Sequence, residues 1–159
     1  MIYTVTFNPA IDYVVRLDRL QPGAINRARE ELVQFGGKGV NVSTVLGNLG
    51  VENVAMGFLA GFTGQALEEG LSAAGVRADF IHLSEGFTRI NVKIKGGEET
   101  EVNGRGPVIG RDALEELYRR LDRLAPGDFL VLAGSIPASL PSDVYEQILA
   151  RLDGRGVQA

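Results

Sequence analysis

Apolar residues follow two patterns along this chain, and the two patterns alternate. Short continuous apolar runs are typical of strands buried in a parallel sheet, whereas apolar residues spaced three or four apart are typical of helices. Alternating strands and helices indicate an α/β fold with a mainly parallel sheet flanked by helices. The predicted core strands are 2–7, 53–59, 79–83 and 129–133, and the predicted helices are 38–49, 63–74, 112–124 and 142–152.

Three of these elements carry more specific predictions. Thr63 is expected to cap the helix that it opens. Strand 129–133 is wholly apolar, so we expect it at the centre of the sheet. Helix 38–49 should turn one apolar face to the core, made of Val42, Val45, Leu46 and Leu49.

A second group of strands shows the alternation of a half-exposed sheet. Residues 88–95 place apolar side chains on one face and polar side chains on the other. Gly96-Gly97 makes a turn and 98–103 returns, which predicts a β-hairpin. Strands at 13–17 and 27–35 also fall outside the alternation of the core. We therefore expect a smaller second sheet beside the core.

Residues Phe35–Asn41, with the sequence FGGKGVN, place three glycines around Lys38 where a helix is predicted to begin. Glycines let backbone amides approach a ligand closely, and the first turn of a helix carries partial positive charge. Lys38 adds a full charge, so the segment suits an anion or polar ligand such as a phosphate ester. A tight strand-to-helix turn explains the same residues. The segment matches neither a P-loop nor a dinucleotide fingerprint.

Composition narrows the class of protein. A chain of 159 residues is long enough for one ordinary domain. The formal net charge of −4 argues against bulk binding to nucleic acid or to an anionic membrane. The lack of cysteine excludes disulfides and cysteine-based zinc sites, and no cluster has the spacing of a metal site. With no signal-peptide pattern and no run long enough to span a bilayer, we expect a cytoplasmic protein.

Polar residues follow the predicted core strands, at the edge where open α/β sheets bind ligands. Asp12 comes shortly after the first strand and could accept hydrogen bonds from substrate hydroxyls, although spacing alone favours an Asn-Pro turn with a solvated Asp. Ser135 follows strand 129–133 at the same edge. On the hairpin, the shared polar face of Arg89, Asn91 and Lys93 is either solvated or part of a site.

Two further features bear on candidate functional sites, the glycine-rich segment at 103–106 and the single histidine. The Asn103-Gly104-Arg105-Gly106 segment could meet a phosphate or could be only a loop. The single histidine, His82, lies in a predicted strand, and no G-x-S-x-G segment is present. A Ser-His triad is therefore not predicted.

Four motifs, taken together and in order, are more specific than any one alone. They are TVTFNPAID at 4–12, GGKGVNV at 36–42, TRINVK at 88–93 and GSIP at 134–137. With these motifs the chain resembles the sugar kinases of the ribokinase-like superfamily, in the phosphofructokinase B branch. The resemblance implies a ribokinase-like core and a small β-sheet lid, formed by segments about 11–35 and 87–104. In that family the lid closes over a sugar phosphate and forms a homodimer contact.

The resemblance also assigns roles to residues of this chain. Asp12 would hold sugar hydroxyls, and Arg89 and Lys93 would neutralise phosphate charge. The sugar and its phosphate would be contacted by Gly37, Lys38 and Asn41, with Asn103 and Ser135 lining the same pocket.

The resemblance covers only the N-terminal half of the family pattern. The family's Gly-Ala-Gly-Asp motif, which supplies an anion hole and the Asp base, does not occur in this chain, so we expect that base to lie beyond Ala159. Most of the ATP and Mg²⁺ site of the complete enzyme is expected to be missing with it. We therefore expect residues 1–159 to be the N-terminal part of a single domain, incomplete at its C-terminus, with no catalytic residue and no activity of its own.

Overall fold

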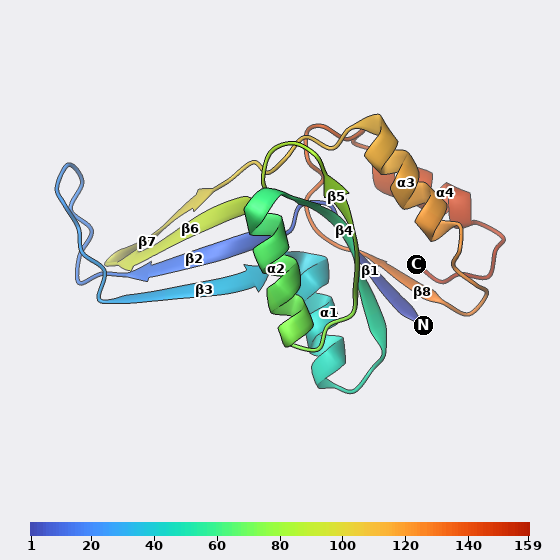
Figure 1. Cartoon of the computed structure of the whole chain (residues 1–159), viewed down its shortest axis with the longest axis horizontal. Helices are drawn as coiled ribbons and strands as arrows, with labels where there is room; N and C mark the ends of the chain where they lie inside the picture. The colour runs from blue at the N-terminus through green and yellow to red at the C-terminus, as the bar shows by residue number, and fades with distance from the viewer.

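The computed structural model describes the chain from Met1 to Ala159, with four helices and eight strands arranged in two sheets (Figure 1). The strands are β1 Ile2–Thr6, β2 Ala10–Arg16, β3 Glu30–Gly36, β4 Asn53–Ala60, β5 Ala78–Leu83, β6 Arg89–Gly96, β7 Glu98–Asn103 and β8 Phe129–Leu132. The helices are α1 Lys38–Asn48, α2 Gly61–Ala73, α3 Arg111–Leu121 and α4 Val144–Leu152. Each predicted strand and helix is present, with displaced ends. None of the helices has the length and hydrophobicity that crossing a bilayer requires.

The first sheet has the strand order β5-β4-β1-β8, and all its strands run parallel. β4 is buried along its whole length because it is an inner strand and both faces of the sheet are covered by helices. β4 and β1 also lie very close together at Gly57, where a Cβ would overlap the carbonyl oxygen of Thr6. This sheet is the parallel α/β core that the alternation predicted.

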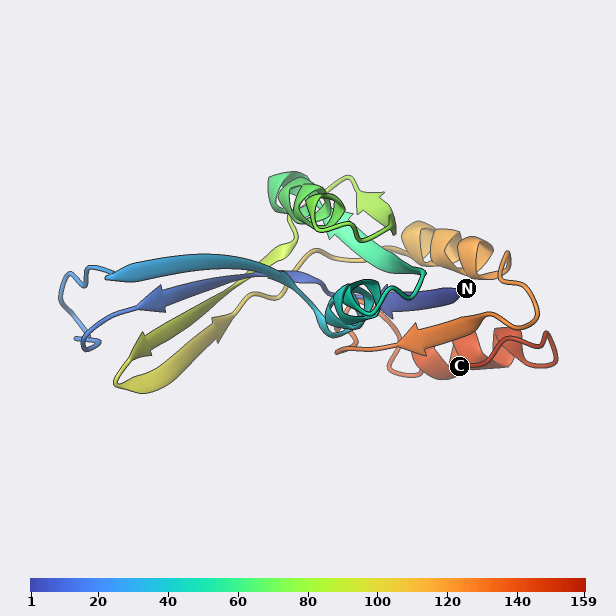
Figure 2. The ribbon, with the colours of Figure 1, turned by 90° about the horizontal axis from the view of Figure 1, so that it is seen from below.

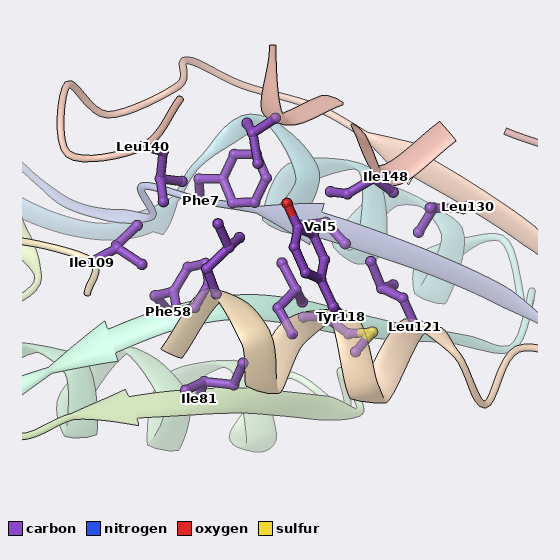
Figure 3. Close-up of a cluster of buried hydrophobic side chains, with 14 of the residues drawn as sticks. Val5, Phe7, Phe58, Ile81, Ile109, Tyr118, Leu121, Leu130, Leu140 and Ile148 are labelled. Carbon is purple, nitrogen blue, oxygen red and sulfur yellow. The ribbon is translucent and has the colours of Figure 1, made fainter. Parts of the chain in front are cut away.

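Two apolar clusters lie on the two faces of this sheet. On one face, Leu121 of α3 and Ile148 of α4 pack over Val5 and Phe58, and all four side chains are almost fully buried (Figure 3). The other cluster lies under α1 and α2 and also takes in Ile11 of β2. The second cluster therefore joins the core to the second sheet.

The second sheet has the order β3-β2-β6-β7. β2 and β6 are parallel, although they are far apart in the chain, whereas β3 and β7 pair antiparallel at the two edges. Figures 1 and 2 both show this sheet extending to one side of the helix-flanked core. Only its base is held by the core, where the ring of Phe35 packs directly on Gly70 of α2.

The predicted inner face of α1 is wrong in part. Val45 and Leu49 are 55% and 72% exposed, and the buried side of the helix carries small residues such as Gly39 and Ser43. A Cβ at Gly39 would overlap the hydroxyl oxygen of Thr6. Small residues thus let α1 approach β1 more closely than a face of leucine and valine would allow.

The prediction that Thr63 caps α2 is also wrong. α2 begins at Gly61, with Ala60 in the capping position and no side-chain cap. The Thr63 hydroxyl instead donates to the carbonyl oxygen of Thr88 at 2.7 Å, and the Thr88 hydroxyl accepts from the Ala60 amide at 3.0 Å. These two bonds tie the start of α2 to the start of β6.

The expected central place of strand 129–133 is not observed. β8 stands at the end of the strand order, and its outer edge carries one isolated parallel bridge, between Phe129 and Gln158. Only Leu130 of the strand is buried and Phe129 is 45% exposed, so the wholly apolar run did not specify either full burial or the neighbours along the sheet.

Candidate functional site

The predicted ligand-binding residues come from both sheets and meet where the sheets join. β1 ends at Thr6, and a loop of three residues leads directly into β2 of the second sheet. β3 returns from the second sheet into α1 through Gly37. The polar face of the second sheet is thereby brought beside the N-terminus of α1.

Asp12 lies within β2, and both of its carboxylate oxygens have partners on β6. Asn91 Nδ2 donates to Asp12 Oδ1 at 2.8 Å, and Lys93 Nζ lies 3.0 Å from Asp12 Oδ2. Lys93 Nζ also lies 3.9 Å from a carboxylate oxygen of Glu101 on β7. The hydrogen bond with Asp12, more than any other cause, raises the pKa of Lys93. Lys93 is therefore protonated at neutral pH.

The missing side chain at Gly36 leaves room for a methyl group between Asp12 and Asn41. A Cβ at Gly36 would lie 3.7 Å from Asp12 Oδ2 and 3.7 Å from Asn41 Oδ1. Gly36 is not in the left-handed region, so its backbone does not itself require glycine. Acceptor oxygens on two sides of a gap suit a ligand that carries several hydroxyl groups.

Gly37 is required by both its backbone and its surroundings. Its φ of 126° is rarely adopted by other residues. A Cβ there would also lie 2.8 Å from Thr6 Cγ2 and 3.1 Å from Pro9 Cα. The glycine lets the chain turn from β3 into α1 against the end of β1.

The first turn of α1 offers positive charge that the chain does not neutralise. Thr6 Oγ1 accepts a hydrogen bond from the Val40 amide at 3.0 Å, and the first helical bond runs from the Asn41 amide to Gly37. The amides of Lys38 and Gly39 come before that bond and have no partner within the helix. The Lys38 side chain is exposed and takes part in none of the ion pairs of the chain. An anion would be stabilised here by the helix dipole and the ammonium group together.

A second cluster surrounds Asn8 in the loop after β1. Arg89 Nε donates to the Asn8 carbonyl oxygen at 3.1 Å, and Asn8 Nδ2 donates to the Arg105 carbonyl oxygen at 3.0 Å. Arg89, Asn103 and Arg105 line a pocket of about 530 Å³. Burial lowers the pKa of Arg89, but a guanidinium remains protonated at neutral pH. Neither arginine has a carboxylate partner, so the pocket suits an anion.

Ser135 belongs to neither of these hydrogen-bonded clusters. It follows β8 at the carboxyl edge of the first sheet, beside the end of β1. Its side chain is exposed and makes no hydrogen bond with the other predicted residues. The neighbouring Gly134 carbonyl accepts from the Tyr145 hydroxyl at 3.2 Å, which helps to hold this loop on α4.

The structure thus groups most of the predicted residues into two sets. Asp12, Lys93, Asn41 and the glycines at 36–37 form one, and Arg89 with Asn103 forms the other. Sequence reasoning did not select Asn91, although it placed this residue on the polar face with Arg89. For Arg105, the sequence did not distinguish a phosphate contact from an ordinary loop residue. The alternation of the hairpin was the available signal for Asn91, because it puts this residue on the face that carries Lys93.

Two other kinds of site find less support in the fold. A pocket of about 770 Å³ lies between residues 81–86 and 106–113, but it contains none of the predicted site residues. The chain has no group of three His, Asp or Glu side chains placed to hold a metal ion.

Comparison with known proteins gives consistent matches along the chain. The model of the pfkB family carbohydrate kinases matches residues 5–157. The chain is 45% identical over 148 residues to the 1-phosphofructokinase of Bacillus subtilis, covering 93% of this chain and 48% of that protein. It is 41% identical over 145 residues to the D-tagatose-1-phosphate kinase of Bacillus licheniformis, covering 91% of this chain and 47% of that protein.

A solved structure matches nearly the whole of this chain. A crystal structure from Staphylococcus aureus superimposes with a TM-score of 0.91 at 43% identity, covering 99% of this chain and 51% of that one. This chain spans about half the length of the curated relatives that it matches.

Proposed function

Since this chain belongs to the pfkB family of carbohydrate kinases, we propose that it supplies the acceptor-sugar half of a 1-phosphofructokinase. The complete enzyme would transfer the γ-phosphoryl group of ATP to the 6-hydroxyl of fructose 1-phosphate and give fructose 1,6-bisphosphate. One observation carries this proposal. Where the two sheets join, the Asp12 carboxylate has two fixed partners, and Lys38 at the start of α1 and Arg89 at the start of β6 make no ion pair.

The two groups of residues divide the ligand between them. Asp12 and Asn41 would accept hydrogen bonds from sugar hydroxyls across the space at Gly36. Lys38 and Arg89 would neutralise the existing phosphate, with Arg105 as a further cation. The remaining contacts of the proposed pocket come from Gly37, Asn103 and Ser135.

The chain does not supply the other side of the reaction. Phosphoryl transfer needs a positioned donor, charge neutralisation and a base for the attacking hydroxyl. The Gly-Ala-Gly-Asp motif that carries the base in this family is absent between Met1 and Ala159, and no metal-binding cluster is present. We therefore propose that the base, ATP and Mg²⁺ belong to the complete enzyme and that this chain alone is inactive. An ADP-release assay with turnover well above background would refute that inactivity.

The sugar itself has close alternatives. Tagatose 6-phosphate and tagatose 1-phosphate present hydroxyl groups and one phosphate to the same donors and acceptors, and one relative is a D-tagatose-1-phosphate kinase. Titration calorimetry with the three sugar phosphates would rank them. We expect fructose 1-phosphate to bind most tightly.

A second candidate function is a non-catalytic sugar-phosphate-binding or dimerising module. The glycines, Asp12 and Lys38, which would contact the sugar phosphate, are all present in this chain, which supports binding without the catalytic half. Val33 and Val102 at the edges of the second sheet are 53% and 59% exposed, which suits a homodimer through this sheet. Sedimentation velocity would test the dimer.

Calorimetry with a matched pair of variants tests the binding proposal. We expect Lys38→Met to weaken fructose 1-phosphate binding by about tenfold, because it removes a cation beside the helix N-terminus. Lys95→Met serves as the control, since Lys95 pairs with Glu99 at 3.3 Å on the hairpin. Equal affinities for the two variants would contradict the proposed phosphate site.

A further inference from the structure

We propose that Lys93 is a positioning residue, which together with Asn91 fixes the Asp12 carboxylate as an acceptor of sugar hydroxyls and does not bind the phosphate. This inference rests on the proposed function, because it concerns the same sugar phosphate. Lys93 differs from Arg89, the other residue expected to neutralise phosphate, because it already makes ion pairs with carboxylates.

The geometry gives each oxygen of Asp12 one partner from β6. Asn91 Nδ2 holds Oδ1 at 2.8 Å and Lys93 Nζ holds Oδ2 at 3.0 Å. Two bonds to different oxygens define the rotation of the carboxylate plane. A carboxylate oxygen can accept more than one hydrogen bond, so each oxygen keeps capacity for a ligand hydroxyl. The Asp12 side chain remains 20% exposed, which leaves it accessible.

Charge decides against a phosphate role for Lys93. Its ammonium group lies within 4 Å of two carboxylates, those of Asp12 and Glu101, so the three groups together carry a net charge of −1. A phosphate dianion approaching this trio would meet net repulsion. Lys38 and Arg89 have no carboxylate within ion-pair distance, and an anion gains more from approaching them.

Asn91 is fixed by its own burial. Its side chain is only 7% exposed, and its Nδ2 is committed to Asp12. Its Oδ1 is buried and has no hydrogen-bond partner within the chain. An unsatisfied buried carbonyl costs free energy, and this oxygen is shielded from solvent. Asn91 and Lys93 thus both place their donors on Asp12 and hold its carboxylate in one orientation.

A double-mutant cycle tests the positioning role. The affinity for fructose 1-phosphate is measured by calorimetry in the wild type, Asp12→Asn, Lys93→Met and the double variant. If Lys93 acts through Asp12, each single change should weaken binding by about tenfold, and the double variant should be no weaker than Asp12→Asn. Losses that multiply to about a hundredfold would overturn the proposal.

Two further measurements separate positioning from a general structural defect. Lys95→Met removes a neighbouring cation on the same strand and face, and should change the affinity by less than about twofold. Lys93→Arg keeps the charge and should restore at least part of the affinity that Lys93→Met loses. A failure of Lys93→Arg to recover any binding would count against the role.

A second probe, inorganic phosphate, addresses the alternative directly. Lys93→Met should leave phosphate binding unchanged, whereas Arg89→Met should weaken it by about tenfold. Equal losses of phosphate affinity in both variants would show that Lys93 contacts the phosphate and would overturn the proposal. A wild-type chain that binds no sugar phosphate would overturn the proposed function as well. Binding with multiplicative losses would overturn the positioning role alone.

Discussion

The two sheets of this molecule differ in how much of their strands is buried. In the first sheet both faces are apolar and covered, and β4 has no exposed residue. In the second sheet one face is apolar and the other carries charges, and β7 is exposed along its whole length. The side chains of the first sheet pack in the core, so substitutions there are limited mainly by their effect on the free energy of unfolding. The second sheet is built to present side chains, so many changes there should alter binding while stability is retained.

The largest difference should appear when a large side chain is truncated in each sheet. Phe58→Ala empties a site that is 1% exposed, and should lower the free energy of unfolding by about 3–5 kcal/mol. Val102→Ala, at an exposed site of the second sheet, should cost under about 0.5 kcal/mol. Urea unfolding of the two variants measures both values. Similar losses would show that the second sheet contributes to the core more than its exposure indicates.

A smaller loss of stability is expected where the two sheets meet. Gly37→Ala forces a side chain into a left-handed backbone at φ 126° and against Thr6 Cγ2. Strain of this kind costs about 1–3 kcal/mol. Urea unfolding checks the prediction, and an unchanged midpoint would contradict the strain.

The neighbouring glycine should respond in the opposite way. Gly36→Ala meets only ordinary contacts at 3.7 Å and has no unfavourable φ, so stability should change by less than about 0.5 kcal/mol. The methyl group would nevertheless fill the space between Asp12 and Asn41. We expect fructose 1-phosphate binding to weaken by about tenfold by calorimetry. Unchanged affinity would mean that the ligand does not occupy this space.

The smallest predicted effects are those of pH, and they differ in sign between the two regions. At the surface of the part built on the first sheet, the hydrogen bond from Arg151 lowers the pKa of Asp122, and a hydrogen bond from the Ala125 amide lowers the pKa of Asp128. A lowered carboxyl pKa stabilises the fold above about pH 4, and that contribution is lost as the pH falls through the folded-state pKa.

In the second sheet, the contacts with raised pKa values should be lost on the alkaline side. The hydrogen bond with Asp12 raises the pKa of Lys93, and the hydrogen bond with Glu31 raises the pKa of Tyr13. Their contribution is complete below about pH 10 and is lost as the pH rises through the folded-state values. Amide hydrogen exchange as a function of pH would test whether β2 and β6 loosen at alkaline pH. Loosening only in acid would contradict the assignment.

Sequence patterns predicted the elements well because each depends on neighbours in the chain. The alternation at 88–95 was sufficient for the hairpin, and the apolar runs located β1, β4 and β8. The sequence pattern gave a wrong prediction where contacts between distant segments determine which side chains are buried. The repeat in α1 identified Val45 and Leu49 as apolar, but the close approach to β1 turned Gly39 and Ser43 inward.

The candidate site shows the same limit. Asp12 and Lys38 were identifiable from their places after a strand and before a helix. The partners of Lys93 were not, because they depend on the parallel pairing of β2 with β6, which are separated by more than seventy residues. Residue type predicted that Lys93 carries charge, and only the fold shows which carboxylates neutralise it.

The parallel register of β2 and β6 has a consequence for insertions and deletions. Asp12 lies opposite Asn91, and successive residues of a strand point to opposite faces. Adding one residue between Arg89 and Ile90 would move Ile90 to the polar face, opposite Asp12, so that Asp12 would face an aliphatic side chain. Laboratory libraries and natural variation should therefore accept length changes in the exposed stretch 21–25 and reject them between 89 and 93. We thus expect this site to tolerate insertions and deletions less well than substitutions.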